Sequence, residues 1–268
     1  MRHSIATLLI LLSWTVTAHC ADSEFFDSDG KTLRYFQGGS GETIVLLHGF
    51  SGSAEGAYID SGTFAALVDG GYHVVALDQI GHGAGDKHYS PDRYSLQMVE
   101  DVRRLLDHLG IQKCHLARYS MGSKVANTFR SRYPERLHTT ILGGYGWPWR
   151  SPQITYEEAQ ERLAERTILP GNDRDPLTAV STGMNVLTPT EDNLRNNSIP
   201  SFAIIGDRDN VASKEDFNTL KRTMSNLNAI TISGTHAGPD GALYKPRYAT
   251  EILAFLQQHH RIAEEHQE

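Results

Sequence analysis

Short apolar runs alternate along most of this chain with segments in which apolar residues recur at helical spacing. The runs 43–47 and 73–77 are apolar after a polar first residue and lie between turn residues, which is typical of strands buried on both faces of a parallel sheet. Segment 96–109 carries apolar residues three and four positions apart and stops at Gly110, as helices do. The alternation predicts an α/β fold with a mostly parallel central sheet and helices on both faces.

The same pattern gives the expected order of elements. The expected strands are 32–36, 43–47, 73–77, 114–119, 139–142, 201–205 and 229–232. The expected helices are 63–68, 96–109, 124–132, 156–166, 177–186, 214–224 and 248–260. No internal repeat or low-complexity tract interrupts them, so the chain is expected to form one α/β domain with an insertion.

The alternation breaks in a segment that is rich in charge, proline and asparagine and carries two of the expected helices. It lies between two core strands, on the side where ligands bind in open α/β sheets, which predicts a small helical cap. A loose surface loop is the alternative. The expected divisions are a core of 21–146, a cap of 147–199 and a second part of the core, 200–268.

Residues 1–20 are expected to be a cleavable signal peptide. An apolar stretch too short for a comfortable membrane span is followed by small residues, Ala18 and Cys20, at the two positions that favour cleavage before Ala21. An uncleaved anchor or a buried helix is the alternative, and His19 argues against a lipidated cysteine because it is too large for its position. The protein is therefore predicted to be secreted or periplasmic, without a stable membrane anchor.

Charge and cysteine content exclude several classes of function. The formal net charge of −7 offers no basic patch for nucleic acid. Cleavage at Ala21 removes Cys20 and leaves Cys114 without a disulfide partner, so Cys114 is expected to be a small core residue. No spacing of histidine or cysteine matches a metal site, and no cofactor is expected.

The candidate chemistry lies where the strand 114–119 runs into the next helix. Ser120 stands at this turn, followed by Met121 and Gly122. A serine on a sharp strand-to-helix turn exposes its oxygen, while the next backbone N–H is free to stabilise an oxyanion. A hydroxyl is a poor nucleophile at neutral pH unless a base takes its proton, so a histidine partner is needed.

Five motifs in order make the chain resemble the α/β-hydrolase family over nearly all of residues 25–260. They are His48-Gly-Phe50 after a buried strand, the Asp-x-x-Gly-His-Gly turn of 78–86, the elbow at Ser120, Gly206-Asp-Arg-Asp209, and Gly234-Thr-His236. Gly85 stands in the second motif where the family usually has serine. The resemblance implies a serine hydrolase whose triad follows the chain order serine, aspartate, histidine.

By this resemblance Ser120 is the nucleophile, His236 the general base and Asp209 the residue that orients the imidazole. The backbone N–H groups of Phe50 and Met121 are expected to form the oxyanion hole. Asp207 is the rival for the acidic position, although the Gly-x-x-Asp frame favours Asp209.

Arg118 departs from the family pattern, because the residue two before the nucleophile is normally small. Its guanidinium must reach water, a carboxylate or an anion; we expect its head to pair with a nearby Asp or Glu, and the alternative is a contact with acidic substrates. The candidates for contact with substrate are His48, Arg118, Tyr119, Tyr145, Trp147 and Trp149.

The predicted function is hydrolysis of a small carboxylic ester through an acyl-enzyme. The same triad also allows hydrolysis of a carbon–carbon bond or an amide, and a non-catalytic binding protein on the same fold is the remaining alternative. Nothing in the sequence indicates the acyl group that is accepted or an oligomeric state.

Overall fold

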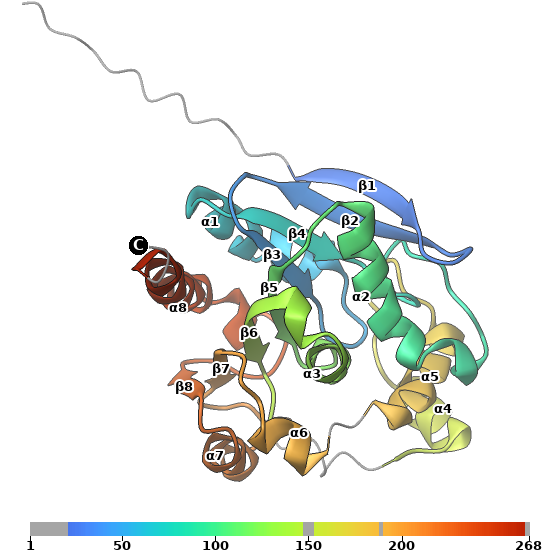
Figure 1. The fold of residues 1–268 in the computed structure, drawn as a ribbon. Coiled ribbons are helices and arrows are strands. Elements are labelled where there is room, and N and C mark those ends of the chain that lie inside the picture. Colours follow the sequence, from blue (N-terminus) through green and yellow to red (C-terminus); the bar gives the residue numbers. More distant parts are fainter. Residues whose placement is uncertain (1–20, 147–152, 188–189, 266–268) are drawn as a thin grey trace, which may run out of the picture.

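The structure is a computed structural model that describes residues 21–146, 153–187 and 190–265 (Figure 1). The predicted signal peptide and two candidate substrate contacts, Trp147 and Trp149, lie outside these residues. Export and the role of the two tryptophans therefore stay predictions.

Eight strands form a single sheet, which is the mostly parallel sheet expected from the sequence. The strands are β1 (Asp22–Asp27), β2 (Thr32–Gly38), β3 (Thr43–Leu47), β4 (His73–Leu77), β5 (Cys114–Tyr119), β6 (Leu137–Gly143), β7 (Ser201–Gly206) and β8 (Leu227–Ile232). Their order across the sheet is β1-β2-β4-β3-β5-β6-β7-β8. The pairs β1–β2 and β2–β4 are antiparallel, and every other pair is parallel. All parallel strands therefore end at the same edge, where ligands bind in open α/β sheets.

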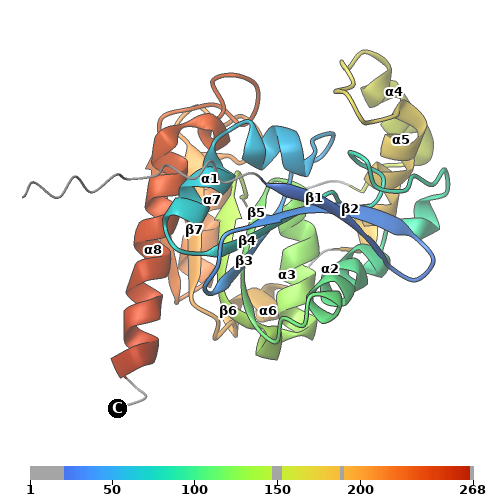
Figure 2. The same ribbon diagram turned by 90° about the horizontal axis from the view of Figure 1, so that it is seen from above.

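Helices cover both faces of the sheet, as Figures 1 and 2 show. They are α1 (Thr63–Asp69), α2 (Leu96–His108), α3 (Gly122–Arg132), α4 (Tyr156–Ala164), α5 (Arg174–Gly183), α6 (Glu191–Arg195), α7 (Lys214–Thr223) and α8 (Pro246–Glu265). Short helical turns cover Glu55–Ile59, Pro91–Arg93, Pro134–Arg136, Met184–Val186 and Ala242–Tyr244. Helices α1 and α8 pack into one core cluster, and α2, α3 and α7 lie against the opposite face.

Every strand and helix expected from the sequence is present, within a few residues of its expected ends. Strand β1 was not expected, because five of its six residues are exposed and only Phe26 is buried. It is nevertheless held in place by antiparallel pairing along its whole length with β2. Helix α6 was not expected either, since its five residues are too few for a recognisable helical period.

The segment between β6 and β7 carries α4, α5 and α6, and α4 and α5 stand together at one end of the molecule (Figure 2). Helix α5 is fixed to the core, since Gly183 lies so close to the backbone of Pro91 and Tyr94 that a Cβ atom there would overlap both. Helix α4 packs on α5 through buried Ala159 and Leu163. These contacts place two helices of the insertion on the core. The cap boundaries of 147–199 stay a prediction.

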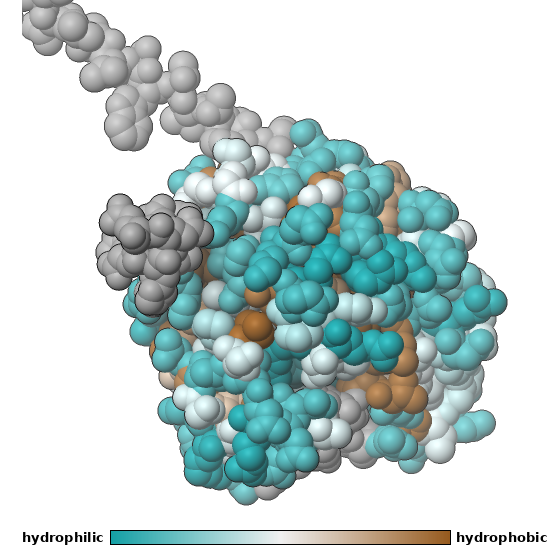
Figure 3. All heavy atoms as spheres, in the orientation of Figure 1, coloured by the Kyte–Doolittle hydropathy of each residue, from teal (hydrophilic) through white to brown (hydrophobic). Residues whose placement is uncertain are grey.

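The described surface is mostly hydrophilic on the face that Figure 3 shows, with small apolar areas between polar side chains. None of the helices in the described ranges is both long and apolar enough to cross a membrane. Cys114, the one cysteine in those ranges, is buried, as expected for a core residue, and burial raises the pKa of its thiol to about 12. The thiol is therefore protonated and unreactive at neutral pH.

One buried carboxyl group makes stability depend on pH. Asp101 on α2 is 1% exposed; its Oδ1 accepts a hydrogen bond of 2.5 Å from Ser28, and its Oδ2 has no partner among the described residues. Burial raises the pKa of Asp101 to about 6, above the value of about 3.9 in an unfolded chain. The folded state thus binds more protons between these values, and the free energy of unfolding falls as pH rises from about 4 to about 6.

Replacing Asp101 with asparagine is expected to stabilise the protein above pH 7 by about 1 to 3 kcal/mol, because the amide stays neutral and still accepts from Ser28. The gain should vanish near pH 3.5, where Asp101 is protonated. Urea unfolding at both pH values measures it, with Asp107→Asn as the control on the same helix, since Asp107 is half exposed and paired with Arg103. An equal stability of wild type and Asp101→Asn at pH 7.5 contradicts the prediction.

Candidate active site

The turn between β5 and α3 holds Ser120 in a strained backbone conformation. Its φ of 48° lies in the left-handed region that residues other than glycine seldom adopt. The turn is forced by a close approach of the helix to β3. A Cβ atom on Gly122 would lie 2.7 Å from the carbonyl oxygen of Leu47 and 3.0 Å from that of His48. The close approach of strand and helix therefore occurs at Gly122, two residues after the serine.

Ser120, His236 and Asp209 come from three distant parts of the chain and form one hydrogen-bonded series. The Nε2 atom of His236 lies 2.9 Å from Ser120 Oγ, and its Nδ1 lies 2.9 Å from Oδ2 of Asp209. The Oδ1 atom of Asp209 also accepts hydrogen bonds from the backbone N–H groups of Val211 and Ala212. These N–H groups fix the carboxylate, which has no exposed surface, so its remaining acceptor faces the imidazole.

Asp207, the rival carboxylate, points away from the imidazole. Its Oδ1 accepts from the backbone N–H of Gly234, 2.9 Å away, and its side chain is half exposed. Asp207 therefore holds the turn that precedes His236 and does not contact the ring. The structure brings Asp209 to the histidine, as the Gly-x-x-Asp frame predicts.

Tyr119 supports the loop that carries His236. Its hydroxyl donates to the carbonyl oxygen of His236 at 2.7 Å, and the two ring centroids lie 5.5 Å apart. Tyr119 was expected from the sequence to contact substrate, but its side chain is buried against the histidine loop. Tyr119 therefore positions His236 and has no free surface for a ligand.

The loop after β3 supplies the other expected oxyanion donor. Neither the N–H of Phe50 nor that of Met121 donates to any acceptor in the described parts of the chain. Gly49 lies beside the nucleophile, since a Cβ atom there would be 3.3 Å from Cβ of Ser120. Two N–H groups that are free to donate, one in this loop and one directly after Ser120, are what stabilisation of an oxyanion requires.

Asp78 fixes this loop, a role that the sequence analysis did not assign. Its Oδ1 accepts from the N–H of Ala54, and its Oδ2 accepts from the N–H of Ala84 and from Nε of Arg34. A carboxylate that joins three segments must approach the backbone closely, so a Cβ atom on Gly83 would lie 2.2 Å from Oδ2. The sequence feature that could have indicated this role of Asp78 is the Asp-x-x-Gly-His-Gly turn, in which an aspartate and glycines lie close together.

His48 stabilises the same loop and does not face a substrate. It is fully buried; its Nε2 accepts from the N–H of Gln79 and its Nδ1 lies 2.8 Å from the carbonyl oxygen of Gly49. Burial lowers its pKa, and burial also lowers the pKa of neighbouring His82 to about 3, so both rings are neutral at pH 7. His48 thus shapes the turn after β3, as its backbone contacts require, but cannot contact a ligand there.

Arg118 and Tyr145 are also buried; Arg118 has no exposed surface and Tyr145 only 7%. Arg118 points into the core toward α3, where its Nη2 donates to Oδ1 of Asn127 at 2.8 Å. The carboxylate partner expected from the sequence is not present, since no Asp or Glu in the described residues pairs with Arg118. Sequence spacing could not reveal Asn127, because the contact depends on how α3 packs on β5.

The segment between α4 and α5 lies over the loop after β3. The amide of Asn172 donates to the carbonyl oxygens of Ser51 and Gly52, at 3.2 and 3.3 Å. The guanidinium of Arg166 lies 5.6 Å from the ring centroid of Phe50. The insertion therefore touches the oxyanion loop directly, next to Ser120.

Comparison with known proteins agrees with this architecture. A family model described as the alpha/beta hydrolase fold matches residues 42–172. The chain is similar to a 2-hydroxy-6-oxo-6-phenylhexa-2,4-dienoate hydrolase of Comamonas testosteroni, with 37% identity over 114 residues, which are 42% of this chain and 40% of that protein. It is also similar to a 2-hydroxy-6-oxononadienedioate/2-hydroxy-6-oxononatrienedioate hydrolase of Escherichia coli (strain K12), with 34% identity over 50% of this chain and 49% of that protein. The match thus spans about half or less of these curated relatives.

A solved structure extends the likeness to nearly the whole chain. A thermophilic esterase from Thermogutta terrifontis superposes with a TM-score of 0.73 and 22% identity, over 90% of this chain and all of that one. The sheet order, the serine turn and the matched segment define one class of protein. This chain has the α/β-hydrolase fold.

Proposed function

We propose that the protein is a serine hydrolase in which Ser120, His236 and Asp209 form the catalytic triad. The observation that supports it is the unbroken series of hydrogen bonds from Ser120 Oγ through the imidazole to a buried carboxylate. A purely structural role gives no reason to hold a serine in a strained turn with its hydroxyl on a histidine nitrogen.

The geometry accommodates acyl transfer in two stages. Ser120 Oγ attacks the acyl carbon while His236 Nε2 takes its proton, and the N–H groups of Phe50 and Met121 stabilise the oxyanion. The imidazolium then gives the proton to the leaving oxygen, which departs as an alcohol and leaves the acyl-enzyme. Water, activated by the same nitrogen, releases the carboxylic acid and restores Ser120. Asp209 keeps the imidazole proton on Nδ1 throughout.

A small carboxylic ester is the substrate class that this arrangement supports first. An alkoxide leaving group needs only the proton that His236 already holds, and nothing further in the described residues is required. The second candidate is hydrolysis of a carbon–carbon bond next to a ketone, which is favoured by the two dienoate-type hydrolases that resemble this chain. A carbanion leaving group then takes the proton instead of an alkoxide.

Labelling with a fluorophosphonate probe tests the nucleophile. The purified protein is expected to take up one probe per chain, and peptide mass spectrometry should map it to Ser120, because only this serine pairs with a histidine base in the described structure. Denatured protein is the control for non-specific uptake. No labelling of the native protein favours a non-catalytic binding protein on the same fold.

A substrate panel distinguishes the two bond types. p-Nitrophenyl esters of increasing acyl length are compared with a 2-hydroxy-6-oxo-dienoate, at equal enzyme concentration. A higher kcat/KM for any ester supports the first candidate. A higher value for the dienoate overturns it in favour of carbon–carbon hydrolysis, with the triad unchanged.

A further inference from the structure

Two buried arginines lie on the α3 side of the sheet, and neither has an acidic partner in the described residues. Arg118 is 0% exposed and Arg130 is 3% exposed. Within the described residues no aspartate or glutamate forms an ion pair with either of them. A guanidinium stays protonated at neutral pH, so the protein interior holds two positive charges here without a compensating negative charge.

The polar atoms around these arginines also lack partners. Nε and Nη1 of Arg118, Nη1 and Nη2 of Arg130 and the hydroxyl of Tyr248 are buried donors with no hydrogen bond in the described residues. A buried polar group without a partner lowers stability, and buried charges usually have a partner. So many unpaired donors in one cluster mark a place that is complementary to an acceptor with negative charge.

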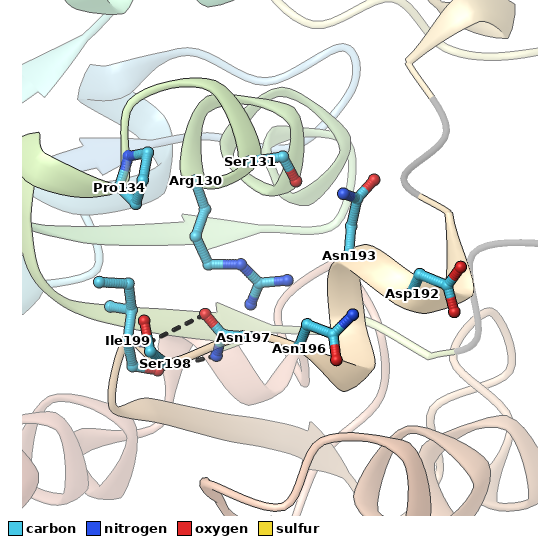
Figure 4. A pocket seen from close by; sticks show the side chains of 9 residues that line it. All are labelled: Arg130, Ser131, Pro134, Asp192, Asn193, Asn196, Asn197, Ser198 and Ile199. Atoms are coloured by element: carbon cyan, nitrogen blue, oxygen red, sulfur yellow. Dashed lines mark hydrogen bonds between the residues drawn. The ribbon is translucent and has the colours of Figure 1, made fainter.

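A pocket of about 250 Å³ opens beside this cluster, between α3 and α6. Arg130 lines it, together with Asn193, Asn196 and Ser198, and Figure 4 shows its guanidinium directed from α3 toward α6. The side chains of Asn196 and Ser198 are exposed and make no hydrogen bond in the described residues. Asp192, the one carboxylate in the lining, is exposed.

We propose that this pocket is a binding site for a small oxyanion, such as phosphate or a carboxylate, which pairs with Arg130. Its charge offsets that of the two arginines, and the free amide of Asn196 and the hydroxyl of Ser198 supply further donors. A planar guanidinium with two unpaired nitrogens matches two oxygens of one such anion.

The shifts in pKa of Arg118 and Arg130 agree with an anion site here. Burial is the main cause that lowers the pKa of Arg118, and the charge of Arg130 lowers it further. Burial also lowers the pKa of Arg130, to about 10. Both groups remain charged at neutral pH, so each destabilises the other until an anion is bound.

The site is separate from the proposed catalytic series. Arg130 stands ten positions after Ser120, at the far end of α3, and no residue of the triad lines the pocket. An anion here is expected to stabilise the fold around α3 and β5. It does not compete with substrate, so the proposal stands whether or not the protein proves to be a hydrolase.

Thermal unfolding in the presence of anions tests the proposal. Sodium phosphate, sodium sulfate and sodium acetate are titrated against sodium chloride at equal ionic strength. At saturation at least one oxyanion is expected to raise Tm by about 5 °C more than chloride does. The phosphate and sulfate arms distinguish a tetrahedral anion from a carboxylate. The absence of any rise above chloride overturns the site.

Two variants locate the effect. Arg130→Met removes the charge but keeps the length of the side chain, and it is expected to abolish the rise. Arg132→Met, on an exposed position of the same helix, should leave the rise unchanged. If Arg130→Met does not fold, Asn196→Asp at the exposed rim is used, and its added carboxylate should weaken the apparent affinity at least about tenfold. If the anion raises the Tm of the pocket variant that is used, Arg130→Met or Asn196→Asp, as much as that of wild type, the anion binds elsewhere and the proposal is overturned.

Discussion

Replacing Ser120 with alanine is expected to lower kcat by a factor on the order of 10⁶, so that only the background of binding and oxyanion stabilisation remains. The reason is geometric, since Ser120 Oγ is the atom within 2.9 Å of His236 Nε2. The measurement is kcat on the best ester of the panel, with active-site titration of the wild type. Activity within tenfold of wild type contradicts the assignment of the nucleophile.

Stability provides the control for this variant. Alanine has the same backbone preferences as serine at a φ of 48°, so the strain of the turn is unchanged. The free energy of unfolding should therefore stay within about 1 kcal/mol of wild type. A loss of activity together with a large loss of stability points instead to a collapsed turn.

Replacing Asp209 with asparagine is expected to lower kcat by about 10⁴, while asparagine at Asp207 should change it less than about tenfold. The amide at 209 still accepts from the N–H groups of Val211 and Ala212, so its NH₂ group turns toward His236. The ring must then present its unprotonated Nδ1 to this donor, which leaves the proton on Nε2, where the base is needed.

Asp207→Asn is the matched control for this prediction, because the two carboxylates stand two residues apart on one turn. The carbonyl of asparagine at 207 can still accept from the N–H of Gly234. Measuring kcat for both variants on one ester decides between them. A larger loss of kcat in Asp207→Asn than in Asp209→Asn contradicts the assignment of Asp209 as the acidic member of the triad.

The sequence could predict which serine, histidine and aspartate form the hydrogen-bonded series, because each of them stands on a turn at the end of a strand. Ser120 needs a strand-to-helix turn, and His236 follows the last strand, so spacing along the chain carries the information. Strand β1 escaped prediction because its stability comes from pairing with β2 and only Phe26 is buried. Pairing of this kind leaves no hydrophobic period in the sequence.

The surroundings of the triad could not be predicted, because they depend on packing between distant segments. Tyr119 was expected to face a ligand, but it supports the loop that carries His236. Arg118 was expected to meet a carboxylate, but it meets Asn127 on the next helix. A buried side chain next to the serine turn looks the same in sequence as one that lines a pocket.

The separation of the triad along the chain has a consequence for biosynthesis. Ser120 and His236 are 116 residues apart, and they meet only after β6, β7 and β8 have joined the sheet. Contacts between such distant segments form late, since closing a long loop must precede them. A nascent chain that has reached only Asp209 therefore has a nucleophile but no base. On the proposed function, hydrolytic activity therefore appears only in a chain whose fold is complete, and truncated or half-folded copies cleave no substrate.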